Sequence, residues 1–250
     1  MDKKLLLSKS LEKIMVELLP QLKEIVRNNT SPEISIKSDT SPLTQLDLAI
    51  NDFLEESLPN YSDASFYTEE KSRNWKFPLF AIDPVDGTKE FIKQRPEWAV
   101  SVAYLENECW QGEGWIFNPM TTEIYSSSQK RIRDNFNILE GEVSHTEWDA
   151  NLYNSYHHSR VSLKPMGSIA YKLGRLSHGQ SDFVVSLKPK NIWDIAAGTL
   201  LCKTQGFKFY SEGLEVKDVR QSYNPPLIWC LEKDSSLLLN LFSKQKDTDL

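Results

Sequence analysis

The stretch that most constrains this chain is residues 83–88, with the sequence DPVDGT. It follows an apolar run at residues 78–82, and such a run bounded by a turn signal predicts a buried strand. Two carboxylates at the end of that strand supply the hard oxygen ligands that Mg2+ prefers. Gly87 lets the backbone come close to a ligand, and the amides of Gly87 and Thr88 would open a helix and face an anion. A cation site beside an anion site suits a phosphate ester as ligand. The alternative interpretation of these residues is an ordinary Asp-Gly turn at the surface.

Length and composition bound the class of protein. A chain of 250 residues can bury a full core, as one large domain or two small ones. The net charge of −6 argues against a protein that coats nucleic acid or lies on a membrane surface. The three cysteines, Cys109, Cys202 and Cys230, form no CxxC pair and fit free thiols in a reducing cytosol. The N-terminal apolar stretch is broken at Ser8 and Lys9, so we expect neither a signal peptide nor a membrane span, and a cytoplasmic location.

Hydrophobic periodicity predicts a mixture of helices and strands. Helical spacing occurs at residues 3–28, where Pro20 should kink or divide the helix, and again at residues 46–58. Three apolar runs separated by polar turns predict an antiparallel meander, at residues 98–104, 114–117 and 122–125. Further on we expect helices at 167–178 and 235–242 and strands at 181–187, 206–210 and 226–231.

Four polar segments fall where helices are expected to start or strands to end. They are residues 37–47 (KSDTSPLTQLD), 68–70 (TEE), 167–172 (GSIAYK) and 193–198 (WDIAAG). Taken singly, each fits a helix cap or a turn, the ordinary use of Ser, Thr and Asp. Of the adjacent acids Glu69 and Glu70, one is expected to face a site, because neighbouring side chains on an extended segment point in opposite directions.

Together, these segments resemble the inositol monophosphatase superfamily of Mg2+-dependent, Li+-sensitive phosphatases. Residues 83–88 resemble its first signature and residues 193–198 its second, and the two lie about 110 residues apart. The segments at 37–47 and 167–172 resemble two further elements of that family. The continuation of the first signature at residues 89–91 (KEF) looks most like the CysQ-type 3'(2'),5'-bisphosphate nucleotidases.

The resemblance implies a fold and a domain organisation. The fold is mixed α/β, a layered αβαβα sandwich in which helices lie between two sheets and the metals at their junction. Residues 1–250 would form a single catalytic domain. Its two sub-domains would run from about 1–160, with the first metal signature, and about 161–250, with the second. Members of the superfamily are often dimers, so a homodimer is possible.

The resemblance also implies the metal ligands. One Mg2+ would be held by Glu69, Asp83 and the carbonyl of Val85, and a second by Asp83, Asp86 and Asp194. Two or three Mg2+ ions per site are expected, and they would activate a water molecule for in-line attack on the ester. The spacing Asp-x-x-Asp differs from the Asp-x-Asp of haloacid-dehalogenase phosphatases, and no HExxH zinc motif occurs.

The remaining roles carried over by resemblance concern the water, the phosphate and the substrate. The nucleophilic water would be oriented by Glu69, Thr88 and Asp47. The phosphate would lie against Gly87, Thr88 and Lys37, and the rest of the substrate would border Ser168 and Lys172. Two basic clusters, residues 130–133 and 157–160, could hold a second phosphate if they line the mouth of the pocket, although most such clusters are solvated surface.

The substrate is less constrained than the chemistry. Inositol-selective members carry a glutamate seven residues before the second-signature aspartate, and this chain has Leu187 there. Together with the KEF variant, this favours a bisphosphorylated nucleoside such as 3'-phosphoadenosine 5'-phosphate. The alternative substrates are inositol or sugar phosphates. A catalytically silent homologue that binds Mg2+ or a nucleotide is the alternative from another class.

Overall fold

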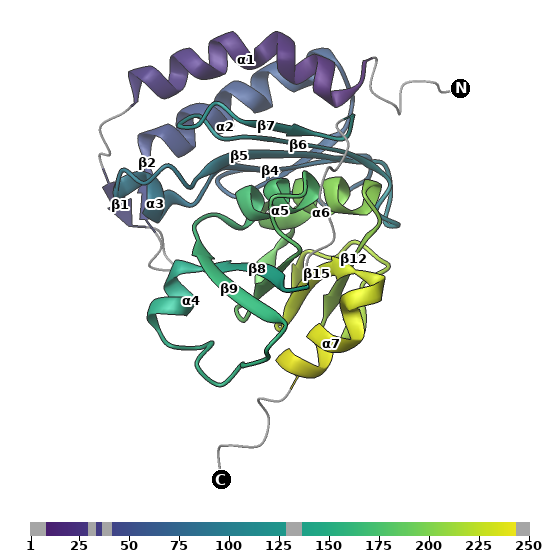
Figure 1. Ribbon diagram of the computed structural model, residues 1–250. Coiled ribbons are helices and arrows are strands. Elements are labelled where there is room, and N and C mark those ends of the chain that lie inside the picture. Colours follow the sequence, from purple (N-terminus) through teal and green to yellow (C-terminus); the bar gives the residue numbers. More distant parts are fainter. Residues whose placement is uncertain (1–8, 30–33, 37–41, 129–136, 244–250) are drawn as a thin grey trace.

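The computed structural model describes residues 9–29, 34–36, 42–128 and 137–243. Within them, helices and sheets alternate in five layers (Figure 1). The outer helices α1 (Leu11–Asn28) and α2 (Gln45–Ser57) cover a five-stranded sheet. Helices α5 (Ile169–Ser177) and α6 (Ile192–Thr204) lie between it and a six-stranded sheet, and α4 (His145–Asp149) and α7 (Glu232–Phe242) lie on the far side. This arrangement confirms the predicted αβαβα sandwich.

The five-stranded sheet carries the first signature. Its strands lie in the order β3 (Ser65–Thr68), β4 (Leu79–Asp86), β5 (Ala99–Leu105), β6 (Gly112–Phe117) and β7 (Ile124–Ser126). The strands from β4 to β7 pair antiparallel, which confirms the predicted meander, and β3 pairs parallel to β4.

The strand β4 runs further than the sequence predicted. Asp83 pairs with Ser101 and Asp86 pairs with Ala99, so the register shifts between them. One extra residue is therefore accommodated as a bulge. Pro84 has no amide hydrogen to donate, and within the bulge no hydrogen bond between the strands is lost on that account. The signature is thus a bulged strand end rather than a turn, and the helix α3 (Thr88–Ile92) follows directly.

The six-stranded sheet has the order β13 (Leu214–Glu215), β12 (Phe207–Ser211), β15 (Leu227–Leu231), β10 (Phe183–Ser186), β8 (Leu139–Ser144) and β9 (Val161–Met166). The strands β8, β9 and β10 pair in parallel, and the others antiparallel. Residues 137–166, whose pattern predicted nothing, thus supply two strands and the helix α4. Two short ladders join β1 (Ile34–Ile36) to β2 (Pro42–Thr44) and β11 (Lys190–Asn191) to β14 (Ser222–Tyr223), and a single 3-10 turn, Leu58–Asn60, follows α2.

Pro20 does not divide the first helix, contrary to one form of the prediction. The helix α1 is continuous from Leu11 to Asn28 with Pro20 inside it. Proline leaves the carbonyl four residues earlier without its helical donor, and here that carbonyl belongs to Val16. Val16 is 54% exposed, so water can satisfy its carbonyl. The part of the predicted helix at residues 3–8 lies outside the described residues.

Small residues let the two central helices approach closely. A methyl group added at Gly198 of α6 would lie 2.3 Å from the Cβ of Leu173 on α5, which is too close for a real contact. Gly198 is therefore required by the helix packing. This packing fixes the first turn of α6 opposite the end of β4, where the signatures meet.

Candidate active site

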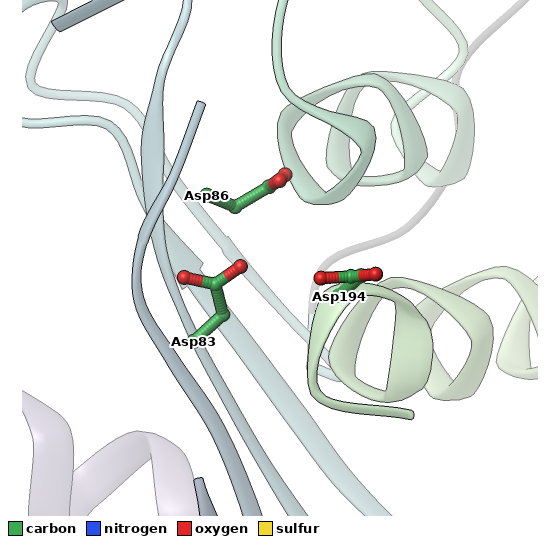
Figure 2. A group of neighbouring side chains, drawn as sticks. All are labelled: Asp83, Asp86 and Asp194. Atoms are coloured by element: carbon green, nitrogen blue, oxygen red, sulfur yellow. The ribbon is translucent and has the colours of Figure 1, made fainter. Parts of the chain in front are cut away.

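Three aspartates from the two signatures converge at the junction of the five-stranded sheet and the central helices. Asp83 and Asp86 lie at the end of β4, and Asp194 lies in the first turn of α6 (Figure 2). Each offers one carboxylate oxygen, and these three oxygens all lie within 4.8 Å of one another. Residues that are far apart in the sequence therefore form one group of hard oxygen ligands.

Local hydrogen bonds orient each of the three carboxylates. Asp83 Oδ1 accepts a bond from the amide of Val85 (3.0 Å). Asp86 Oδ2 accepts bonds from the Ser168 hydroxyl and the Ala170 amide, both at 2.5 Å, which ties β4 to the start of α5. Asp194 Oδ2 accepts a bond from the amide of Asn191 (2.8 Å), as the N3 residue of a capping box. The helix-cap interpretation of Asp194 is thus correct, and the cap also aims its carboxylate.

The electrostatics of the cluster favour a bound cation. Burial, together with the charges of Glu69, Asp86 and Asp194, raises the pKa of Asp83 well above its ordinary value. Burial likewise raises the pKa of Asp194 to about 7, although Lys190 opposes the shift, and raises that of Asp86 against its bonds from Ser168 and Ala170. Acids held together with little solvent repel one another, and a divalent cation with oxygen ligands relieves that repulsion. The donor set therefore fits Mg2+.

Glu69 lies next to this group but outside it. Its amide donates to the carbonyl of Ile82 (3.0 Å), which sets the end of β3 beside Asp83. Its side chain lines the main pocket and raises the pKa values of Asp83 and Asp194. Glu70 does not line that pocket, as expected if only one of the two acids faces the site.

Thr88 and Asp47 meet beside the acid cluster. The Thr88 hydroxyl lies 3.4 Å from Asp47 Oδ1 and 3.1 Å from the carbonyl oxygen of Val85, and it has one proton to give to either. Asp47 is fully buried, and its other oxygen accepts bonds from the amide (2.8 Å) and the hydroxyl (2.5 Å) of Thr44 at the start of α2. The expected juxtaposition of Asp47 and Thr88, 41 residues apart in sequence, is therefore present in the structure.

Gly87 is needed for its conformation. It precedes α3 with φ +95°, and a Cβ there would also lie 3.1 Å from the Cβ of Trp98 and 3.2 Å from that of Ser168. A side chain would be strained and crowded at this place. Glycine thus keeps the backbone exposed to the pocket between the acids and Ser168.

Ser168 and Lys172 line the same pocket from α5. Ser168 caps that helix through a bond from the amide of Tyr171 (2.9 Å) and donates to Asp86. Lys172 is 2% exposed, and its ammonium donates to the carbonyls of Met166 (3.0 Å) and Gly167 (3.4 Å). Burial lowers the pKa of Lys172 to about 8, against the opposing charge of Asp86. Lys172 is therefore held by the backbone at the pocket wall.

Some predicted residues lie elsewhere. Lys37 and the basic cluster at residues 130–133 lie outside the described residues. His157 and His158 line a different pocket, together with Trp148 and Tyr156, and not the pocket with the acids. The condition under which this cluster could hold a second phosphate is therefore not met by His157 and His158.

Several pocket residues had no role assigned from the sequence. The pocket has a volume of about 280 Å³ and is also lined by Ser144, Thr146, Ser186, Lys89 and Lys190. Lys190 comes from the short strand β11 just before the second signature, in a segment with the sequence KPKN, so its position near Asp194 was a usable signal. Ser144 and Thr146 come from the end of β8 and from α4, where the sequence offered no such signal.

Comparison with known proteins places the chain in a family. It matches the Inositol monophosphatase family over residues 7–151. It is 28% identical over 200 residues to the 3'(2'),5'-bisphosphate nucleotidase CysQ of Buchnera aphidicola, covering 70% of this chain and 73% of the relative. It is 26% identical over 207 residues to CysQ of Escherichia coli strain K12, covering 72% of this chain and 81% of that protein. Thermotoga maritima IMPase has the same fold, with a TM-score of 0.78 at 20% identity over 93% of this chain and 96% of that one.

Within the described residues, no helix has both the length and the apolar character needed to cross a membrane. The family match spans more than half of the chain and includes the first signature, whose two aspartates meet Asp194 in the structure. The chain therefore belongs to the inositol monophosphatase family and is a phosphatase.

Proposed function

We propose that this phosphatase is a Mg2+-dependent 3'(2'),5'-bisphosphate nucleotidase that hydrolyses 3'-phosphoadenosine 5'-phosphate to AMP and phosphate. The observation that carries the proposal is the convergence of Asp83, Asp86 and Asp194 beside a pocket that Asp86 lines together with three lysines. The similarity to CysQ nucleotidases over about 70% of the chain supports the choice of substrate.

The acids would hold the cations. We assign Glu69, Asp83 and the carbonyl of Val85 to one Mg2+, and Asp83, Asp86 and Asp194 to a second, with two or three ions in all. Bound Mg2+ would supply Lewis-acid stabilisation of the phosphate charge and lower the pKa of water. The described residues hold three acids close enough for this role, and Glu69 borders them.

The chain's own groups would orient the reactants. Thr88, bonded to Val85 or Asp47, would accept a hydrogen bond from the attacking water molecule and so direct the lone pair of that water at the phosphorus. Asp47 would keep the Thr88 hydroxyl in that orientation, and Glu69 would take the proton of the water. The amides of Gly87 and Thr88 would bind phosphate oxygens, and Lys37 is assigned to the same phosphate by resemblance.

A second phosphate needs its own cations. Lys190 and Lys89 line the pocket on side chains that are partly or fully exposed, whereas Lys172 is buried and bonded to backbone carbonyls. We therefore assign the 5'-phosphate to Lys190, with Lys89 near it, and the ribose to the region of Ser168 and Lys172. Lysine binds phosphate as a point charge that needs little geometric precision.

The alternative substrates are inositol or sugar phosphates. Leu187 occupies the position of the glutamate that binds a ring hydroxyl in inositol-selective members, and its backbone amide donates to Glu147 (3.2 Å). Glu147 is 1% exposed and also accepts bonds from Ser186 (3.0 Å) and Tyr153, so it is not available to replace that anchor. These contacts favour the nucleotide.

The test compares substrates with one and two phosphates. Phosphate release would be measured with 3'-phosphoadenosine 5'-phosphate, 3'-AMP, inositol 1-phosphate and fructose 1,6-bisphosphate, each with and without Mg2+. A silent binding homologue would release no phosphate from any of them. Preference for inositol 1-phosphate or the sugar bisphosphate would reject the nucleotidase assignment.

Lys190→Ala tests the second phosphate site. Losing one charged hydrogen bond should raise the KM for 3'-phosphoadenosine 5'-phosphate by roughly 10- to 100-fold. The KM for 3'-AMP, which lacks the 5'-phosphate, should change little. The matched control is Lys188→Ala, which removes an exposed lysine from the same segment but not from the pocket. Equal losses with both nucleotides would contradict the assignment.

By family resemblance, we also propose inhibition by millimolar Li+ and a cytoplasmic location. The free thiols of Cys109, Cys202 and Cys230 are compatible with a reducing compartment.

A further inference from the structure

Arg73 touches two parts of the site that lie far apart in sequence. Its Nη2 donates to the backbone carbonyl of Glu69, and its guanidinium carbon lies 4.4 Å from the ring centroid of Trp193. Trp193 immediately precedes Asp194 in the first turn of α6. Arg73 does not line the pocket, so its contacts are with the protein and not with the space for substrate.

The segment that presents Glu69 is a closed turn. The Thr68 amide donates to the carbonyl of Ser72 (2.8 Å), and Tyr67 and Arg73 form an isolated antiparallel bridge. The Thr68 hydroxyl is buried and accepts bonds from the amides of Lys71 (3.2 Å) and Ser72 (3.1 Å). The Thr68 side chain thus supplies an acceptor that closes the turn. Glu69 lies at the start of this turn, and Arg73 at its end.

Arginine is suited to contact both the Glu69 carbonyl and the Trp193 ring. Its planar guanidinium can stack on an aromatic ring while it donates hydrogen bonds in its own plane. The Arg73 guanidinium lies over Trp193 and 5.6 Å from the ring of Tyr67, whose own ring lies 5.5 Å from that of Trp193. With the guanidinium over Trp193, Nη2 still donates a hydrogen bond to the Glu69 carbonyl. A lysine could not make both contacts from one flat group.

We propose that Arg73 is a positioning residue that fixes the Glu69 backbone against the first turn of α6, and so sets the spacing between the carboxylates of Glu69 and Asp194. The inference rests on the proposed function in one respect, namely that both acids serve the same metal centre. Ligands held in place before the ion arrives bind it more tightly, because less freedom is lost on binding. Residues that orient metal ligands typically contribute 10- to 100-fold in metal affinity.

The first experiment measures Mg2+ binding by isothermal titration calorimetry, without substrate, for the wild type and for Arg73→Ala. We expect the variant to bind Mg2+ roughly 10-fold more weakly. The Mg2+ concentration for half-maximal phosphate release should rise in proportion, while kcat at saturating Mg2+ changes little. Arg73→Lys should restore less than half of the loss in binding free energy. A direct role of Arg73 in substrate binding would instead raise the KM at unchanged Mg2+ affinity, and would overturn the proposal.

Lys71→Ala is the matched control. Lys71 lies in the same turn and forms an exposed ion pair with Asp52. Its removal takes away one positive charge near Glu69 but neither contact of Arg73. We expect Mg2+ affinity close to that of the wild type. Weakening equal to that of Arg73→Ala would show that charge alone is responsible, and would refute the positioning role.

A double-mutant cycle with Trp193→Leu tests the stacking contact. If Arg73 acts through Trp193, Arg73→Ala should weaken Mg2+ binding far less in the Trp193→Leu background than in the wild type. If the losses in Mg2+ binding free energy from the two substitutions are fully additive, Arg73 does not act through Trp193. Thermal unfolding of the metal-free variants should show that Arg73→Ala is as stable as the wild type, and a large loss of stability would also count against the proposal. A wild type that binds no Mg2+ would refute the proposed function itself, whereas Arg73→Ala with wild-type affinity would refute only this inference.

Discussion

Replacing Asp194 by asparagine removes one negative charge from the acid cluster but leaves an oxygen in the same place. The carbonyl oxygen of asparagine can still accept the bond from the Asn191 amide that closes the capping box. The helix α6 should therefore keep its start. Two effects follow, in opposite directions: the metal-free protein becomes more stable, and the enzyme loses its activity.

The pKa of Asp194 sets the size of the gain in stability. Its folded pKa is about 7, against ~3.9 in an unfolded chain. The folded state therefore holds this proton more tightly, so the free energy of unfolding falls as the pH rises from about 4 to about 7 and is constant above that range. A pKa difference of about 3 corresponds to about 4 kcal/mol. Because Asp194 is partly exposed, solvent screening reduces the expected effect to about 2–4 kcal/mol.

The assay is thermal unfolding in the presence of a chelator, at about pH 8 and at about pH 4.5. At the higher pH, Asp194→Asn should unfold on the order of 5–10 °C above the wild type. At the lower pH the two should nearly coincide, because wild-type Asp194 is then protonated in the folded protein. Saturating Mg2+ should raise the melting temperature of the wild type and much less that of the variant.

Phosphate release completes the test. Turnover should be lost, because the amide nitrogen of asparagine would replace the carboxylate oxygen that we assign to the second cation. A variant no more stable than the wild type at about pH 8 would refute the electrostatic account of the cluster. A variant that keeps near-normal turnover would reject Asp194 as a metal ligand.

Two further substitutions probe the surroundings of the cluster. Asp47→Asn should lower kcat on the order of 100-fold with nearly unchanged Mg2+ affinity, because Asp47 contacts Thr88 and is not one of the three clustered acids; normal kcat would show that Thr88 does not need the Asp47 carboxylate. Glu147→Ala should lower the free energy of unfolding by about 1–3 kcal/mol, because it leaves the Leu187 amide without its buried acceptor, whereas the Ser186 hydroxyl can still donate to the Lys188 carbonyl. Urea unfolding measures this loss, and an unchanged midpoint would contradict it.

The sequence predicted the sheet around the first signature and the residues that form the acid cluster. The meander was readable because its strands are neighbours in sequence and separated by polar turns. The end of β4 was placed too early, because a bulge keeps Asp86 paired with Ala99 beyond the proline. The pattern of apolar residues alone cannot show a bulge, since a bulge depends on the register in which the neighbouring strand pairs.

The second sheet was much less predictable. Its strands β8, β9 and β10 pair in parallel, so each needs a long connection and none is flagged by a hairpin turn. Ser144 and Thr146 reach the pocket only through this pairing, and Arg73 meets Trp193 only through the packing of a surface turn on α6.

The sequence by itself, through the two signatures that resemble those of the inositol monophosphatase family, indicated which acids this protein can offer to a cation. Only the tertiary structure decided that three of those acids lie within 4.8 Å of one another, and that burial raises the pKa of Asp194 to about 7. Charge interactions and desolvation depend on distance and on surrounding atoms rather than on order along the chain. Residue type therefore sets the possible chemistry, and packing sets whether that chemistry is available.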